Sequence, residues 1–158
     1  MRRARISAIV SAIIVASSMT VARLAPAADH PSPGVAVQVR GKVTEVLGKL
    51  QKSVADNGMM VMGELHQGKV LSMTGLKVES ETIFVGNPAI GKQVFEQNPG
   101  AGIVLPVRIN VYADADGKTV VAYDPPSHLL AEFKNAKIDE IGRMLDGKLQ
   151  MLTQMLAK

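Results

Sequence analysis

Two hydrophobic patterns alternate along the chain, and together they predict a domain that mixes α and β structure. Apolar and polar positions alternate over residues 35–40, 59–66 and 105–112, and short β-branched or aromatic runs occupy 82–85 and 118–123. Alternation with period two is typical of a strand with one buried side and one accessible side. The pattern therefore predicts five strands.

Apolar residues at helical spacing predict two longer helices between and after these strands. The first runs through 43–54, and the second covers 136–157 with Asn135 as its N-cap. Gly142 and Gly147 each cost the second helix about 1 kcal/mol relative to alanine. A break within this helix is therefore an alternative to one continuous helix.

Turn-forming residues divide the remaining chain into shorter elements. Gly86-Asn87-Pro88 ends the third strand and starts a helix, with Asn87 as a candidate N-cap. Asp116-Gly117 lies between two strand-like runs, which is typical of a hairpin. Residues 67–74 form a predicted short helix, and Ser127 is a candidate cap for another.

Four motifs occur in a fixed order: Gly86-Asn87-Pro88, Leu105-Pro106, an Asp-Gly hairpin and Tyr123-Asp124-Pro125-Pro126. This set, with a glycine-led strand from Gly58 to His66, resembles the domain of unknown function 302 family over roughly 35–133. The resemblance implies an α+β fold similar to the TATA-binding-protein-like class. It implies an antiparallel sheet in the order β-α-β-β-β-β-α, with short extra helices and the helices packed on one face. It implies no activity, because the name of the family records none.

The first residues of the chain have the pattern of a secretory signal peptide. Three arginines lie within the first five residues, an uncharged apolar run covers 6–22, and small residues at 25–28 suit cleavage. We expect residues 1–28 to be removed during export. The protein is then periplasmic or secreted and has no stable membrane anchor.

Removal of this segment changes the electrostatic picture. Residues 29–34 form a predicted tether, and 35–158 form a predicted single α+β domain. Four of the 18 basic residues and none of the 14 acidic residues precede residue 29, so 14 of each remain and the formal charge of +4 falls to zero. Scattered basic residues and only five aromatic residues argue against a nucleic-acid partner.

Polar side chains gather where the predicted strands end. His66 ends the second strand, Asn87 follows the third, and Tyr123 and Asp124 close the hairpin. Arg108 occupies the polar side of a hairpin strand. These five residues are the candidate ligand-binding set, and the alternative is that they are turn residues and solvated polar positions.

The second strand also offers a candidate metal site. Met62, Glu64 and His66 alternate on one predicted side, and thioether and imidazole groups suit copper and other transition metals. Haem is a second candidate cofactor, with His66 as its ligand. The alternative is that the methionines fill gaps in a core.

Common catalytic signatures are absent from the sequence. It has no cysteine, no Gly-x-Ser-x-Gly elbow, no phosphate loop and no His-Glu-x-x-His. We therefore favour a non-catalytic module that binds a small ligand, a metal or haem. Two alternatives stay open. One is a structural or homodimeric domain using the terminal helix, which a strict monomer in light scattering would exclude. The other is an enzyme in which His66 works with Asp124, or His128, in acid–base catalysis.

Overall fold

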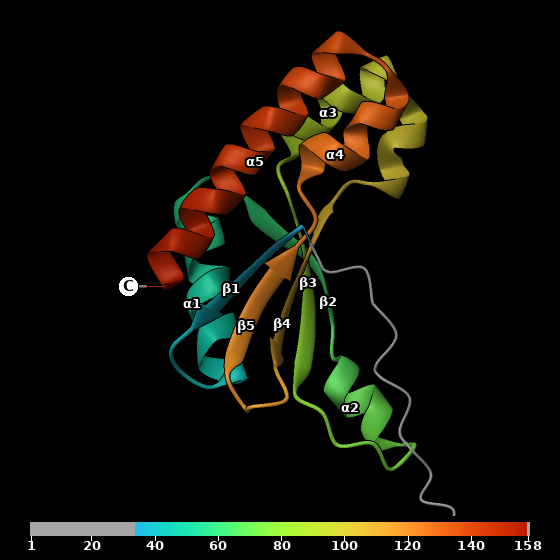
Figure 1. Ribbon diagram of the computed structural model, residues 1–158. Coiled ribbons are helices and arrows are strands. Elements are labelled where there is room, and N and C mark those ends of the chain that lie inside the picture. The colour runs from blue at the N-terminus through green and yellow to red at the C-terminus, as the bar shows by residue number, and fades with distance from the viewer. Residues whose placement is uncertain (1–33, 158) are drawn as a thin grey trace, which may run out of the picture. The chain divides into compact units, whose positions relative to one another are not determined.

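A five-stranded antiparallel sheet lies at the centre of the computed structural model, which describes residues 34–157 (Figure 1). The strands are β1 (Val35–Val39), β2 (Met60–Leu65), β3 (Ser80–Gly86), β4 (Val107–Ala113) and β5 (Thr119–Tyr123), and they lie in the order β1-β5-β4-β3-β2. The predicted signal peptide, and the predicted tether up to residue 33, lie outside the described residues.

Residues 34–157 also contain five α-helices and two short 3₁₀ helices. They are α1 (Val43–Asp56), α2 (Gln67–Ser72), α3 (Pro88–Gln97), η1 (Pro99–Ile103), α4 (Pro126–Leu130), η2 (Ala131–Phe133) and α5 (Ala136–Leu156). The predicted α+β class and the order β-α-β-β-β-β-α are confirmed, with α2, α3 and α4 as the short extra helices. Within the described residues there is no helix with the length and apolarity that a bilayer crossing requires.

Asparagine side chains fix the start of two helices, as the sequence predicts. The Oδ1 atom of Asn87 accepts hydrogen bonds from the backbone N–H groups of Ala89 at 2.8 Å and Ile90 at 3.1 Å. Asn135 accepts equivalent bonds in the first turn of α5. These bonds satisfy N–H groups that have no partner inside the helix.

One face of the sheet, here called the helix face, packs against α1 and the C-terminal half of α5. The buried residues of this sheet core include Ile83, Ile109, Val111 and Val121 from the strands, Leu50 and Val54 from α1, and Leu149 and Leu152 from α5. The opposite side is here called the open face. It carries the alternate residues of the central strands, because successive side chains of a strand point in opposite directions.

A second core lies beyond one end of the sheet and belongs to a helical cap. We define the cap as α3, η1, α4, η2 and the N-terminal half of α5 (Figure 1). Its buried residues are Val94, Ala101, Leu130, Ile138, Ile141 and Leu145. Helix α5 is continuous across both cores, so the alternative of a break at its glycines is wrong.

The alternation predicted for β2 is interrupted in the structure. The pairing register with β3 shifts at Met62, which marks a β-bulge. Beyond the bulge, Glu64 pairs with the core residue Ile83 and so lies on the helix face. Leu65, which the alternating pattern places on the side opposite Glu64 and His66, is 44% exposed. Because the bulge adds one residue to β2, the side chains beyond it point to the other face of the sheet than strict alternation predicts. A period-two pattern alone does not show this change.

Candidate functional site

A cleft of about 480 Å³ lies between the open face of the sheet and the helical cap. We call it the cap cleft. It is lined by Phe84, Ile103, Val104, Pro106, Val107, Arg108, Asp124, Pro126, His128, Leu129, Glu132 and Phe133. Its volume falls within the range of about 300–1,000 Å³ that is usual for small-molecule sites.

The strands supply one wall of the cleft and its central charged pair. Phe84 of β3 lies directly opposite Arg108 of β4, so both side chains share the open face. Asp124 directly follows β5, and its Oδ2 atom lies 3.9 Å from the Nη2 atom of Arg108. Pairing of β3, β4 and β5 thus brings together residues that are 24 and 16 positions apart in the sequence.

The cap supplies apolar side chains that are in contact with solvent. Ile103, at the end of η1, is 89% exposed, and Leu129 of α4 is 42% exposed. Phe133 is partly buried and packs against the cap core. Large apolar side chains that remain accessible beside a hollow, with polar groups around them, are typical of a binding site.

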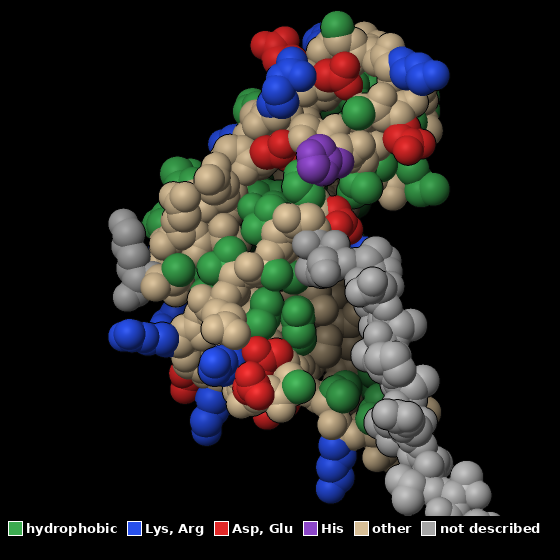
Figure 2. All heavy atoms as spheres, in the orientation of Figure 1, with side chains coloured by type: hydrophobic (Ala, Val, Ile, Leu, Met, Phe, Trp, Pro, Cys, Tyr) green, Lys and Arg blue, Asp and Glu red, His purple; other side chains and the backbone are tan. Residues whose placement is uncertain are grey.

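Charged groups of both signs surround these apolar walls. His128 and Glu132 are four residues apart along α4 and η2, a spacing that favours the same side of a helix. In Figure 2, acidic and basic side chains are interspersed with hydrophobic ones over the cap. The cleft is therefore an apolar hollow whose rim has no single dominant charge.

The position of α4, and with it one wall of the cleft, is set by α5. The backbone N–H of Ser127 donates a hydrogen bond to the Oδ1 atom of Asp146 at 3.1 Å. A Cβ atom on Gly142 would lie only 2.8 Å from the Cα atom of Ser127, so only glycine permits this approach. The predicted cap role of Ser127 is wrong, because α4 begins one residue earlier, at Pro126.

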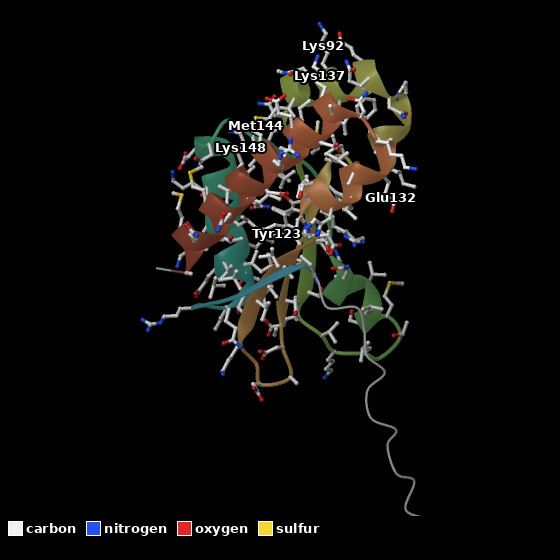
Figure 3. All side chains as sticks on the ribbon, turned by 45° about the horizontal axis from the view of Figure 1, so that its top comes forward. Lys92, Tyr123, Glu132, Lys137, Met144 and Lys148 are labelled. Carbon is white, nitrogen blue, oxygen red and sulfur yellow. The ribbon has the colours of Figure 1, made fainter. Side chains whose placement is uncertain are left out.

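Two of the five candidate ligand-binding residues, Arg108 and Asp124, line the cap cleft. Tyr123 does not, because it lies on the helix face and is only 5% exposed. Burial raises the pKa of its phenol; a hydrogen bond with Thr153 opposes this shift, and the carboxylate of Asp146 adds to it. In Figure 3, Tyr123 lies where the sheet meets α5, whereas Glu132 lies at the edge of the cap.

Asn87 has a structural role in this fold. Besides capping α3, it donates from Nδ2 to the backbone carbonyl of Gly58 at 2.7 Å. This bond ties the start of α3 to the turn between α1 and β2. The amide is therefore committed at both ends, and it lies outside the cap cleft.

His66 lies at the end of β2 that faces away from the cap. Its Nδ1 atom is 2.6 Å from the Oε2 atom of Glu81, whose cross-strand partner is the core residue Val111 on the helix face. Asp124 lies beside Arg108 on the open face. The structure therefore does not bring His66 and Asp124 together, and the acid–base hypothesis that pairs them is wrong. His128 and Asp124, in contrast, line the same cleft.

The three candidate metal residues contact different neighbours. Met62 lies beside Gly86 at the bulge, and Glu64 accepts a hydrogen bond from Gln51 of α1 at 2.6 Å. His66 contacts Glu81 instead. Within residues 34–157, no three or more histidine, cysteine or acidic side chains are arranged to hold a metal ion.

The apolar walls of the cleft are what sequence reasoning missed. Leu129, Leu130 and Phe133 all fit the apolar side of one predicted helix, and nothing separates them by residue type. One signal was available: adjacent residues of a helix point about 100° apart, so Leu129 and Leu130 need not be buried to the same extent. In the structure Leu130 is buried and Leu129 lines the cleft.

Comparisons with known proteins agree with this fold. The family model described as "Domain of unknown function DUF302" matches residues 35–158. A crystal structure of an uncharacterized conserved DUF302 protein from Bacillus stearothermophilus is similar, with a TM-score of 0.72 and 22% sequence identity. The similarity covers 77% of this chain and 96% of that protein. No curated protein sequence matches the chain.

Proposed function

This chain belongs to the DUF302 family, and on that premise we propose that it is a binding protein that takes an apolar small molecule into the cap cleft. The observation that carries the proposal is the combination of a hollow of about 480 Å³ with exposed apolar walls. Covering such walls with an apolar ligand is favourable by about 25 cal/mol for each Å² removed from water. Arg108, Asp124, His128 and Glu132 then orient the polar end of that ligand.

Titration with the neutral apolar dye N-phenylnaphthylamine tests the proposal. We expect saturable binding at one site. Dye fluorescence measures it on protein purified from the native host, with whatever N-terminus that host leaves on the chain. The Ile103→Ser variant removes apolar area from the cleft wall, so it should weaken binding by about 1–2 kcal/mol, or about five- to thirtyfold. Ile103 is 89% exposed, so this change should leave the fold intact.

Met73→Ser is the matched control for this experiment. Met73 is 87% exposed, close to the exposure of Ile103, but it lies at the end of α2 and does not line the cap cleft. We expect wild-type dye affinity in this variant. Equal losses in both variants, or no saturable binding by the wild type, would contradict a ligand site in the cap cleft.

We also propose that the protein is exported, on the basis of the arginine-rich start and the apolar run at 6–22. Intact-mass measurement of protein from the native host provides the test. We expect a mature chain that begins near Asp29 and that is recovered from the periplasm or the medium. A cytoplasmic protein that retains residues 1–28 would contradict export.

The cofactor hypothesis stays a prediction, and residues 34–157 contain no group of three or more histidine, cysteine or acidic side chains that could hold a metal ion. His66 contacts Glu81 through Nδ1, whereas Met62 lies beside Gly86, so these two candidate ligands have different neighbours. His128 lies in the cap cleft with two carboxylates and an arginine. This mixed rim suits an organic ligand better than a metal, which needs several converging ligands.

A further inference from the structure

We propose that the ligand of the cap cleft is a zwitterion with an apolar body, of the chemical class of an apolar α-amino acid. This inference rests on the proposed function and adds the charge of the ligand to it. The evidence is the neighbouring positive and negative group, Arg108 and Asp124, at the edge of the apolar hollow.

The two charged groups are close but do not satisfy each other. Their nearest atoms, Nη2 of Arg108 and Oδ2 of Asp124, are 3.9 Å apart, whereas a charge-assisted hydrogen bond measures about 2.7–2.9 Å. The side chains are 68% and 43% exposed, and ion pairs this exposed contribute little to stability. Both groups are therefore available to a ligand at small cost to the fold.

The position of Asp124 is fixed independently of Arg108. Its other carboxylate oxygen, Oδ1, accepts a hydrogen bond from the backbone N–H of Gly34 at 3.3 Å. Oδ2 is left facing the guanidinium and the cleft. Among the hydrogen bonds of residues 34–157, none engages the guanidinium of Arg108, which keeps its donors for a carboxylate.

A ligand with a single charge fits this pair poorly. A carboxylate at Arg108 would stand beside the like charge of Asp124, and an ammonium at Asp124 would stand beside Arg108. A zwitterion places a carboxylate at the arginine and an ammonium at the aspartate at the same time. In an α-amino acid the ammonium and the carboxylate are attached to the same carbon atom. This short separation suits Arg108 and Asp124, whose charged groups are neighbours.

The apolar body of the ligand has a wall beside this charged pair. Phe84 lies directly across from Arg108 on the open face, and Leu129 and Phe133 face the hollow from the cap. A side chain attached to the zwitterionic carbon can thus lie among aromatic and aliphatic groups while its head remains at the rim. The apolar part of such a ligand would contact the apolar side chains of the cleft, and its charged part would contact Arg108 and Asp124 at the rim.

Calorimetric titration with three compounds of one shape tests the inference. They are L-phenylalanine, phenylpropionate, which lacks the ammonium, and phenethylamine, which lacks the carboxylate. We expect phenylalanine to bind about fivefold more tightly than either analogue, the gain from one additional exposed ion pair. The protein is again purified from its native host.

Two variants should each remove one of the two preferences for phenylalanine. Arg108→Gln should remove the advantage of phenylalanine over phenethylamine, and Asp124→Asn should remove its advantage over phenylpropionate. Arg143→Gln, at an exposed position of α5 outside the cleft, should change neither preference. Unchanged binding of N-phenylnaphthylamine, which has no charge, shows that each variant still has an intact cleft.

The outcomes separate this inference from the function on which it rests. If the neutral dye binds in the cleft but the three compounds bind equally, or phenylalanine binds least, the zwitterion inference is wrong and the apolar site stands. If the dye does not bind either, the proposed function itself fails. The loss of a different one of the two preferences in each variant is the result that supports a zwitterion held by Arg108 and Asp124.

Discussion

Replacing Leu130 with alanine should lower the free energy of unfolding by about 3 kcal/mol, since truncating a fully buried leucine costs about 2–5 kcal/mol. Leu130 has no exposed area and joins α4 to the cap core. The change should lower the melting temperature by about 10 °C for a domain of this size. Because α4 also carries His128 and Leu129 of the cleft, dye affinity should fall as well.

Leu129→Ala provides the matched control for this prediction. Leu129 is the adjacent residue of the same short helix, but it is 42% exposed and lines the cleft. We expect a loss of stability below about 1 kcal/mol together with weaker dye binding. Equal loss of stability in the two variants, measured by denaturant unfolding, would mean that the cap core is not packed as described.

Replacing Gly142 with alanine should destabilise the protein, although alanine is the better helix former. The new Cβ would lie 2.8 Å from the Cα atom of Ser127, so α4 and α5 must separate. Overpacking costs about 1–3 kcal/mol, and contact with a backbone atom favours the upper part of this range, above the gain of about 1 kcal/mol from helix propensity. Urea unfolding should therefore show a lower midpoint with an unchanged slope.

Gly147→Ala, five residues further along α5, separates helix propensity from packing. A Cβ atom there meets nothing within 4 Å. This variant should gain up to about 1 kcal/mol, because alanine reduces the freedom of the unfolded chain without a clash. If both glycine variants were stabilising, the close contact between α4 and α5 would be contradicted.

The same two glycines show how far the sequence could lead. Both glycines made a break in α5 an open alternative, although helical spacing places Gly142 on the apolar side of α5 and Gly147 on the opposite side. The sequence does not show what Gly142 meets: it approaches Ser127 of α4, whereas Gly147 meets nothing within 4 Å. The continuous helix follows because α5 is held by two cores, one at each half, and this outweighs the cost of two glycines.

The candidate site was predicted in part for a similar reason. The sequence marked Asp124 as a polar group at a strand end and Arg108 as a residue on the polar side of a hairpin strand, and the cleft contains both. It also marked His66, Asn87 and Tyr123, which lie respectively at the far end of β2, at the start of α3 and on the helix face. Being at a strand end does not determine at which end of the sheet, or on which face, a side chain lies.

The sequence by itself determined the types of element, their order and the asparagine caps of α3 and α5. Each of these depends on periodicity or on hydrogen bonds that span only a few residues. Tertiary structure alone decided that Arg108 meets Asp124, that the bulge at Met62 exchanges the sides of β2, and that the cap leaves a hollow over the open face. These features depend on strand register and on packing between distant segments, which local patterns do not encode.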